Sequence, residues 1–343
     1  MTQSKHQPTS SLPLIQLIAT GGTIAMKRNT AGAAVPAITG DDLLAAVPGA
    51  AELAAVEVDN FSNIPSGYIA PEHWLALYQR VTASLAREDI SAVIIAHGTD
   101  TLEETAFFLD LTVHSSKPII VVGAQRNSSC PDSDGPANLL DALRVAVTRQ
   151  AGSCGALVVM NQKIIAARDA IKVHTHNVVG FGAYDNAVMG AIDRGYVHFC
   201  RSSSIKRLVK ARQKVALSEA SLEGQTLPRV DIVAMYAGAE GGLIDAAITA
   251  GAKGVVIQAL GAGNVNQSMF AAIKKAIRGG VPVLISTRVP HGGVAPVYGY
   301  EGGGQSLVDC GAVLAGDLSP HKARVLLMLK LQQAIEEKPA LCV

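Results

Sequence analysis

The sequence predicts an α/β fold: a doubly wound, mostly parallel sheet in a larger N-terminal domain, followed by a smaller α/β domain at the C-terminus. Short aliphatic runs alternate along the chain with longer amphipathic segments, the pattern of repeated strand–helix units. The composition is 49% hydrophobic but contains only 6 Phe and 1 Trp, which favours an aliphatic core. The length of 343 residues exceeds the roughly 250–300 residues that one hydrophobic core usually organises.

The aliphatic runs in the N-terminal part are typical of buried parallel strands, because a strand covered by helices on both faces is apolar along its whole length. Four runs fit this description, at residues 13–19, 91–96, 117–124 and 155–160. Three amphipathic segments are long enough for the helices that connect parallel strands, at residues 71–86, 101–113 and 136–149.

Composition also indicates where the domains begin and end. Residues 1–11 are polar and are expected to form a disordered tail before an N-terminal catalytic domain at 12–200. The basic and polar stretch at 201–227 lacks a strand-like run, and we interpret it as an interdomain linker. The smaller domain is expected at 228–343, with strands at 229–238, 253–263 and 281–289 and a last helix from about Pro320 to Glu337.

Charge and cysteine content exclude several classes of protein. The formal net charge is +1, so no long-range field attracts nucleic acid or an anionic membrane surface. The 5 cysteines show neither CxxC metal spacing nor a disulfide framework, which favours a reduced, cytoplasmic setting without a metal. No apolar run reaches the roughly 18 residues of a membrane span, and the first run is too short and interrupted for a signal peptide.

Two turns that directly follow predicted strands combine threonine with glycine. The first spans Thr20 to Thr23 and contains Gly22; the second spans His97 to Thr101 and contains Gly98. Open α/β sheets bind ligands at the carboxyl ends of their strands, and glycine lets the backbone approach a ligand closely. An ordinary tight turn with a helix-capping threonine explains the first segment equally well.

The second turn divides into structural and chemical candidates. Thr101 and Glu104 have the T-x-x-E spacing of a capping box, so we expect them to start the following helix. His97 is expected to be a hydrogen-bonded core residue rather than a base. Thr99 and Asp100 then have no structural duty, which makes them candidates for catalysis.

A threonine hydroxyl is a weak nucleophile and needs a neighbouring base to take its proton. Burial can lower the pKa of a lysine far enough for this role. Lys172, which follows the predicted strand at 155–160, is the candidate in the same domain; the alternative interpretation is a surface charge.

Seven segments, in order over residues 13–335, resemble the bacterial L-asparaginases: IATGGTIA (18–25), IIAHGTDTLEETAFFLDL (94–111), SDGPANL (133–139), RDAIK (168–172), GAGN (261–264), RVP (288–290) and HKARVLL (321–327). The pair TGGTIA and HGTDT makes the resemblance specific. It implies a primary nucleophile at Thr23 and a second triad of Thr99, Asp100 and Lys172.

The resemblance also implies how substrate is bound. It places the serine that holds the substrate carboxylate at Ser66 and an asparagine from a neighbouring subunit at Asn264. The full set of expected binding residues is Gly22, Ser66, Gly67, Gly98, Asn264 and Glu301. A homotetramer is expected, built from dimers whose sites lie between the N-terminal domain of one chain and the C-terminal domain of another. No cofactor is implied.

The chain departs from the family pattern where the amine end of the substrate is bound. Residues 25–40, the loop after TGGTIA, contain no tyrosine, although many family members carry one there. Gly67 replaces the usual polar residue after the binding serine. In the family, an acidic residue of the partner chain often contacts the substrate amine, and Glu301 is the candidate for that residue here. Candidates for the missing phenol are Tyr68, Tyr298 and Tyr300.

The sequence therefore predicts an amidohydrolase that hydrolyses asparagine or a related small carboxylate-bearing amide to the acid and ammonia. Glutamine, a D-amino-acid amide or an amide without an α-amine remain alternatives. A substrate larger than asparagine, or one that lacks the α-amine, predicts weak asparagine turnover. A non-catalytic amide sensor and a tRNA-dependent amidotransferase subunit are further alternatives; the latter is expected to need an additional N-terminal domain. A dehydrogenase is disfavoured because Asn266 occupies the third glycine position of the G-x-G-x-x-G pattern that begins at Gly261.

Overall fold

The computed structural model describes residues 12–183, 188–200, 214–217, 222, 224 and 226–336. The expected tail at 1–11 and most of the expected linker at 201–227 lie outside the described residues, so both remain predictions. In the described part of the chain, no helix is long and apolar enough to cross a membrane.

The N-terminal domain is built on an eight-stranded sheet with the order β12-β11-β8-β7-β6-β5-β1-β4. Its five parallel strands are β1 (Leu14–Gly21), β4 (Ala55–Ile64), β5 (Ile90–Ala96), β6 (Ile119–Val122) and β7 (Ala156–Met160). Three antiparallel strands extend one edge: β8 (Lys163–Ala166), β11 (Gly190–Asp193) and β12 (Tyr196–Phe199). The mostly parallel sheet expected from the aliphatic runs is thus confirmed.

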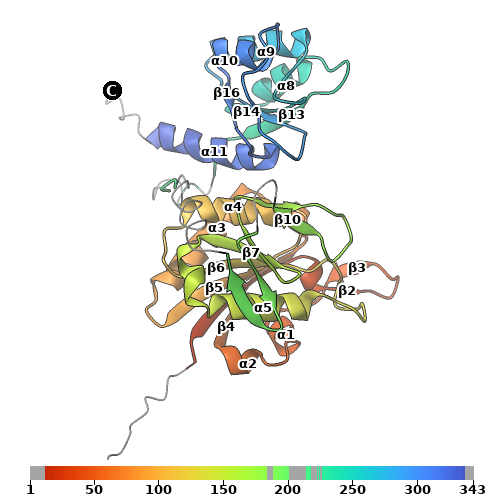
Figure 1. The fold of residues 1–343 in the computed structure, drawn as a ribbon, viewed down its shortest axis with the longest axis vertical. Helices are drawn as coiled ribbons and strands as arrows, with labels where there is room; N and C mark the ends of the chain where they lie inside the picture. Colours follow the sequence, from red (N-terminus) through yellow and green to blue (C-terminus); the bar gives the residue numbers. More distant parts are fainter. Residues whose placement is uncertain are drawn as a thin grey trace, which may run out of the picture.

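Helices cover both faces of this sheet, with α4 above it and α5 below it in Figure 1. On one face, α3 (Pro71–Ala86) packs against α4 (Leu102–Thr112), and the rings of Trp74 and Phe108 stack with centroids 5.5 Å apart. On the other face, α5 (Gly135–Ala146) contacts α1 (Gly40–Ala45) and α2 (Ala50–Leu53). Because both faces are covered, the central strands are apolar throughout; Val93, Ile94 and Ile95 are fully buried.

The structure contains several strands in the N-terminal domain that the sequence does not predict. Strand β4 mixes polar and apolar residues and pairs with β1 at one edge of the sheet, so it lacks a continuous aliphatic run. The others are only 3 or 4 residues long: β8, β11 and β12, the hairpin of β2 (Met26–Arg28) and β3 (Ala34–Pro36), and the hairpin of β9 (Ala170–Lys172) and β10 (Phe181–Ala183). Such short antiparallel strands show too few alternations to be distinguished from loops.

The C-terminal domain contains a four-stranded parallel sheet with the order β13-β14-β15-β16. Its strands are β13 (Val230–Ala234), β14 (Gly254–Ala259), β15 (Val283–Thr287) and β16 (Val313–Leu314), and its helices are α8 (Gly242–Thr249), α9 (Gln267–Arg278), α10 (Gly304–Asp309) and α11 (Pro320–Glu336). Helix α11 begins at Pro320 as expected. It lies between the two sheets, packed on β14 and on α4 of the N-terminal domain (Figure 1).

Candidate active site

The candidate site lies where three neighbouring strands end. In space β1 stands between β4 and β5, so the turns that follow these three strands are adjacent, although β4 and β5 are separated in sequence by α3. From β1 the chain continues to β4 on one side and later to β5, β6 and β7 on the other. This change of direction is the topological switch point at which doubly wound sheets bind their ligands.

The two glycine turns touch each other through their backbones. A Cβ atom added to Gly22 would lie 2.0 Å from Cα of Gly98, and one added to Gly98 would lie 2.7 Å from Oγ of Ser66. Gly22 also has a φ of +80°, a conformation that favours glycine. Thr23 and Thr99 directly follow these glycines, so the backbones of the two threonines lie near each other where β1 and β5 end.

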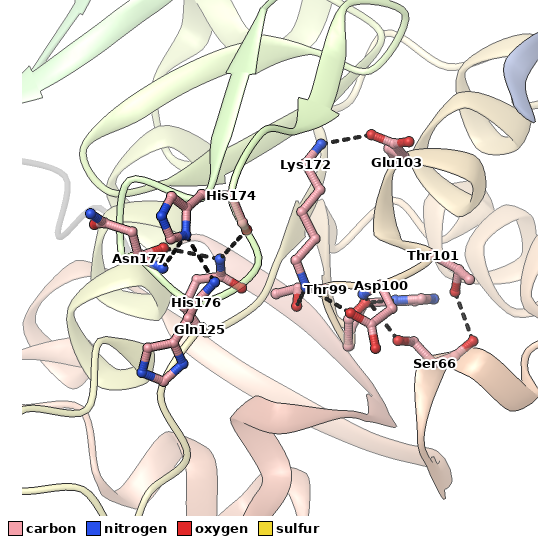
Figure 2. A network of polar contacts seen from close by, with 12 residues as sticks. Ser66, Thr99, Asp100, Thr101, Glu103, Gln125, Lys172, His174, His176 and Asn177 are labelled. Atoms are coloured by element: carbon pink, nitrogen blue, oxygen red, sulfur yellow. Dashed lines mark hydrogen bonds and ion pairs between the residues drawn. The ribbon is translucent and has the colours of Figure 1, made fainter. Parts of the chain in front are cut away.

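Lys172 reaches this place from a distant segment. Its Nζ donates to Oγ1 of Thr99 at 2.8 Å and to Oδ1 of Asp100 at 2.7 Å (Figure 2). The Lys172 side chain is 19% exposed, whereas that of Asp100 is 74% exposed, so the cluster lies at the surface with its amine largely covered. A hydroxyl, an amine and a carboxylate are therefore joined in one hydrogen-bonded group.

Lys172 comes after the strand at 155–160, as expected, and the structure shows what lies between them. The lysine does not follow the strand at 155–160 directly, because the chain first turns back through β8 and then enters β9, of which Lys172 is the last residue. Strand β9 pairs with β10 and stands apart from the eight-stranded sheet. The backbone N–H of Lys172 donates to Oε2 of Glu103 in the first turn of α4, at 2.8 Å.

Ser66 connects the turn after β4 to the turn after β5. The serine is 5% exposed, and its Oγ accepts a hydrogen bond from the Asp100 N–H at 3.2 Å. Since the hydroxyl acts as an acceptor here, its own hydrogen can be donated to a ligand. Gly67 next to it is not required by space, because an added Cβ would meet nothing within 4 Å.

The expected capping box at Thr101 and Glu104 is wrong. Thr101 is the N-cap residue of α4, but its hydroxyl makes no capping bond; it donates instead to the Ser66 carbonyl at 2.8 Å. Glu104 lies 3.8 Å from Arg324 of α11, and burial raises the pKa of its carboxyl. Contacts with neighbouring segments have replaced the local bonds that the spacing predicts.

The expectation of a hydrogen-bonded core histidine at position 97 is confirmed. His97 is fully buried, with Nδ1 2.7 Å from the Gly98 carbonyl and Nε2 3.0 Å from Oγ1 of Thr105. Burial lowers the pKa of His97 to about 4, so its ring is neutral near pH 7. The histidine thus supports the turn that carries Thr99.

Thr23 begins a short 3-10 helix, η1 (Thr23–Ala25), and is half-buried. The β2–β3 hairpin follows it, and the chain then returns to the turn, where the N–H groups of Ala37 and Ile38 donate to the Ala25 carbonyl at 3.0 and 3.1 Å. Of the candidate tyrosines, only Tyr68 is in this domain; it lies two residues after Ser66 and is 71% exposed.

Asn264 and Glu301 are in the C-terminal domain, whereas Thr99, Asp100 and Lys172 are in the N-terminal domain. They are neighbours there, because the Val265 N–H donates to the Gly302 carbonyl at 2.8 Å. Among the described residues, no hydrogen bond or ion pair joins either one to Thr99, Asp100 or Lys172. The Oδ1 atom of Asn264 is buried and has no hydrogen-bond partner in this part of the chain.

Tyr298 and Tyr300 are in the same C-terminal region. Their rings lie 5.8 Å apart and are about half exposed. In the described part of the chain, no hydrogen bond or ion pair joins these two tyrosines to Thr99, Asp100 or Lys172 either.

Sequence reasoning missed the residues that position Lys172 and the loop after it. Glu103 was visible only as an acidic residue near a helix start, where acidic residues are common. Gln125, 8% exposed, donates through Nε2 to the carbonyls of His174 and Asn177 at 3.1 and 3.0 Å (Figure 2). No local pattern reveals such contacts, because the partners lie 49 and 52 residues away along the chain.

Fold and site together define a two-domain α/β protein in which the Thr99 hydroxyl, the Lys172 amine and the Asp100 carboxylate meet at the switch point of a doubly wound sheet. Two family models match it: "Asparaginase, N-terminal" over residues 14–204 and "Glutaminase/Asparaginase C-terminal domain" over residues 229–339. The chain therefore belongs to the asparaginase family and is an asparaginase-like amidohydrolase.

Individual relatives agree over nearly the whole chain. The L-asparaginase 2 of Bacillus subtilis is 36% identical over 93% of this chain and 83% of its own length. A probable L-asparaginase of Deinococcus radiodurans is 37% identical over 94% of both chains. The crystal structure of a probable cytoplasmic L-asparaginase from Campylobacter jejuni superposes with a TM-score of 0.82, at 36% identity over 94% of this chain and 98% of the other.

Proposed function

We propose that this amidohydrolase cleaves the side-chain carboxamide of asparagine, or of a related small carboxylate-bearing amide, to the acid and ammonia. The observation that carries the proposal is the Lys172 amine, which lies within hydrogen-bond distance of both the Thr99 hydroxyl and the Asp100 carboxylate. This arrangement meets the need of a threonine nucleophile for a base and of that base for an orienting group. Relatives named as L-asparaginases support the choice of substrate.

The proposed reaction is acyl transfer. Thr23 or Thr99 attacks the amide carbon and loses its hydroxyl proton to the Lys172 amine, which Asp100 holds in place. The C–N bond then breaks, and the departing nitrogen takes the proton from Lys172 and leaves as ammonia. Water then cleaves the resulting ester, which releases the acid and restores the threonine hydroxyl. Lys172 must be neutral at the moment it accepts the proton.

Backbone N–H groups of the two turns are proposed to stabilise the oxyanion, each worth about 3 kcal/mol in acyl-transfer sites. The Gly22 N–H donates to the Ile64 carbonyl at 3.0 Å, and the Asp100 N–H donates to Ser66. The oxyanion donors are therefore proposed among the other amides of the two turns.

Ser66 is proposed to bind the carboxylate of the substrate. Its hydroxyl is buried beside the two glycine turns and accepts from the Asp100 N–H, which orients the hydroxyl hydrogen away from that amide. Gly22, Gly67 and Gly98 are proposed to leave room for the substrate at these turns.

The amine end of the substrate is proposed to be bound by a second copy of the chain. Asn264 and Glu301 are neighbours in the C-terminal domain, and the buried Oδ1 of Asn264 has no partner among the described residues. A homotetramer built from two dimers would bring these residues to the N-terminal cluster of another chain.

We further propose residues 12–200 and 228–343 as the two domains, joined by 201–227, with 1–11 as a tail. We propose the cytoplasm as the place of action because the cysteines form no disulfide framework. No partner other than the amide substrate and further copies of the chain is proposed.

Ammonia release over a panel of L-asparagine, L-glutamine, their D-forms and succinamic acid tests the proposed function. We expect turnover of at least one amide, and a fall in kcat of about 10³-fold or more in Thr23→Ala and in Thr99→Ala, with both variants folded. Thr82→Ala is the matched control, because the Thr82 hydroxyl donates only to carbonyls of its own helix. Either active-site variant retaining more than about a tenth of wild-type kcat counts against the proposal.

Mass spectrometry after rapid acid quenching assigns the nucleophile. An acyl ester on the peptide that contains Thr23, and not on the one that contains Thr99, identifies the first threonine as the attacking group. The opposite pattern identifies Thr99.

A further inference from the structure

One buried lysine in the described part of the chain has a place that the proposed reaction does not explain. Lys322 stands in the first turn of α11, the helix between the two domains, and is 1% exposed. Its Nζ donates to the carbonyls of Arg168 and Ala170 at 2.7 and 2.5 Å and lies 5.8 Å from the centre of the Phe107 ring. A buried ammonium group is costly, so these contacts need a reason beyond packing.

Both carbonyls belong to the segment that ends at Lys172. Ala170 is the first residue of β9 and Lys172 is the last. Strand β9 is not part of the eight-stranded sheet, and its strand partner in the described part of the chain is the three-residue β10. Hydrogen bonds of the large sheet therefore do not fix the position or direction of β9, and contacts from other elements must do so.

Those contacts come from both domains. From the N-terminal domain, Glu103 accepts a hydrogen bond from the Lys172 N–H. From the C-terminal domain, Lys322 binds the two carbonyls, and Asp317 accepts from both terminal nitrogens of Arg168 at 3.0 and 2.5 Å. The segment at 168–172 is thus held at three alternate residues, Arg168 and Ala170 by the smaller domain and Lys172 by Glu103.

From this geometry we infer that Lys322 is a positioning residue: from the C-terminal domain it fixes the backbone of β9 and thereby places the Lys172 amine against Thr99 and Asp100. The inference rests on the proposed function for its effect on turnover. The geometry of the active site then depends on how α11 packs against the N-terminal domain, although Lys322 itself does not contact the substrate. The smaller domain then serves the reaction within its own chain, in addition to what Asn264 and Glu301 are proposed to supply to another chain.

The test compares Lys322→Met with Arg324→Met in the full-length protein. Arg324 is a matched control, because it also stands on α11 and donates to a backbone carbonyl, that of Val230 in the C-terminal sheet. Among the described residues, the only charged partner of Arg324 is Glu104, at 3.8 Å. We expect kcat to fall about 10²-fold in Lys322→Met with KM changed less than about threefold, because the amine moves and the Ser66 contact does not. Arg324→Met keeps the wild-type kcat within about twofold.

A second readout does not depend on activity. Lysines labelled with ¹³C at Cε report each amine by NMR, and the Lys172 signal is assigned from its loss in Lys172→Arg. We expect this signal to shift in Lys322→Met and to stay in place in Arg324→Met. If the wild-type protein releases ammonia from no amide, the proposed function fails, but the NMR comparison still decides whether Lys322 positions Lys172.

Two results would overturn the inference: a folded Lys322→Met variant with unchanged kcat and an unmoved Lys172 signal, or equal losses in Lys322→Met and Arg324→Met. If Lys322→Met does not fold, Asp317→Asn decides, because the Asp317 side chain is 49% exposed and holds the same segment through Arg168. A smaller fall in kcat with a shifted Lys172 signal supports the inference, and no change in either contradicts it.

Discussion

Gly22 and Gly98 hold the two threonine turns in contact, and they do so in different ways. Gly22 needs both its positive φ and the absence of a side chain, whereas Gly98 needs only the space, since an added Cβ would lie 2.7 Å from Ser66 Oγ and 2.8 Å from Gly22 Cα. A methyl group at position 98 is therefore expected to push the turn that carries Thr99 away from both Gly22 and Ser66.

Gly98→Ala is expected to lower the free energy of unfolding by about 1–3 kcal/mol, as overpacking does, and to lower kcat about 10²-fold. Urea unfolding and ammonia release measure the two effects. Gly242→Ala is the control: nothing lies within 4 Å of its added Cβ, and the residue is helical, so stability should stay equal or rise by up to about 1 kcal/mol. Wild-type turnover in Gly98→Ala would show that close contact between the turns is not needed.

The buried ring of His97 predicts acid sensitivity. Its pKa is about 4 in the folded chain and 6.5 in the unfolded chain, so between these values the unfolded state binds a proton that the native state does not. The free energy of unfolding should therefore fall as pH drops from 6.5 to 4, by roughly 3 kcal/mol from this residue. NMR titration of the histidine rings checks the native value; a His97 pKa near 6.5 would contradict this account.

At the scale of elements, the sequence predicts what is long and periodic. Helix α3 has the predicted bounds of Pro71 and Ala86, and the aliphatic runs coincide with β1, β5, β6 and β7. The turns after β1 and β5 were predicted as a site because parallel strands end at the same edge of a sheet. The hairpin that carries Lys172 was not predicted, since strands of three residues have no readable period.

Helix α11 predicts an alkaline effect on stability through Lys322. Burial lowers the pKa of this amine to about 8, against 10.5 in the unfolded chain, with Glu103 and Asp169 opposing the shift and Arg168 adding to it. Between these pH values the unfolded state again binds more protons, so this residue makes the native state more stable as pH rises from about 8 to 10.5. Chemical unfolding across this range should show that the free energy of unfolding of wild type gains roughly 3 kcal/mol relative to that of Lys322→Met, which lacks this amine.

Across the two domains, one chain carries the Thr99–Asp100–Lys172 cluster in the larger domain and Asn264, Glu301, Tyr298 and Tyr300 in the smaller one. The resemblance of short motifs implies that Asn264 acts on another chain, and this stays a prediction. Sequence alone does not give the arrangement of the two domains, because it depends on how α11 packs the small domain against α4.

Complementation tests whether two chains form each site. Thr99→Ala and Asn264→Ala should both be nearly inactive alone, since each damages every site of a homo-oligomer. Refolding an equimolar mixture should restore about a quarter of wild-type activity, because half of the random dimers carry one site with neither change. A mixture as inactive as its components would show that Asn264 serves its own chain or none.

We propose that the Lys172 amine accepts the proton of a threonine hydroxyl, which can then attack the amide. The most direct measurement is the kcat for ammonia release by Lys172→Met, beside Lys275→Met. The Lys275 side chain is 72% exposed and pairs with Asp245 at the surface. The account predicts a fall of about 10³-fold or more in the first variant and wild-type turnover in the second, with both proteins folded. A folded Lys172→Met protein that keeps more than about a tenth of wild-type kcat would contradict it.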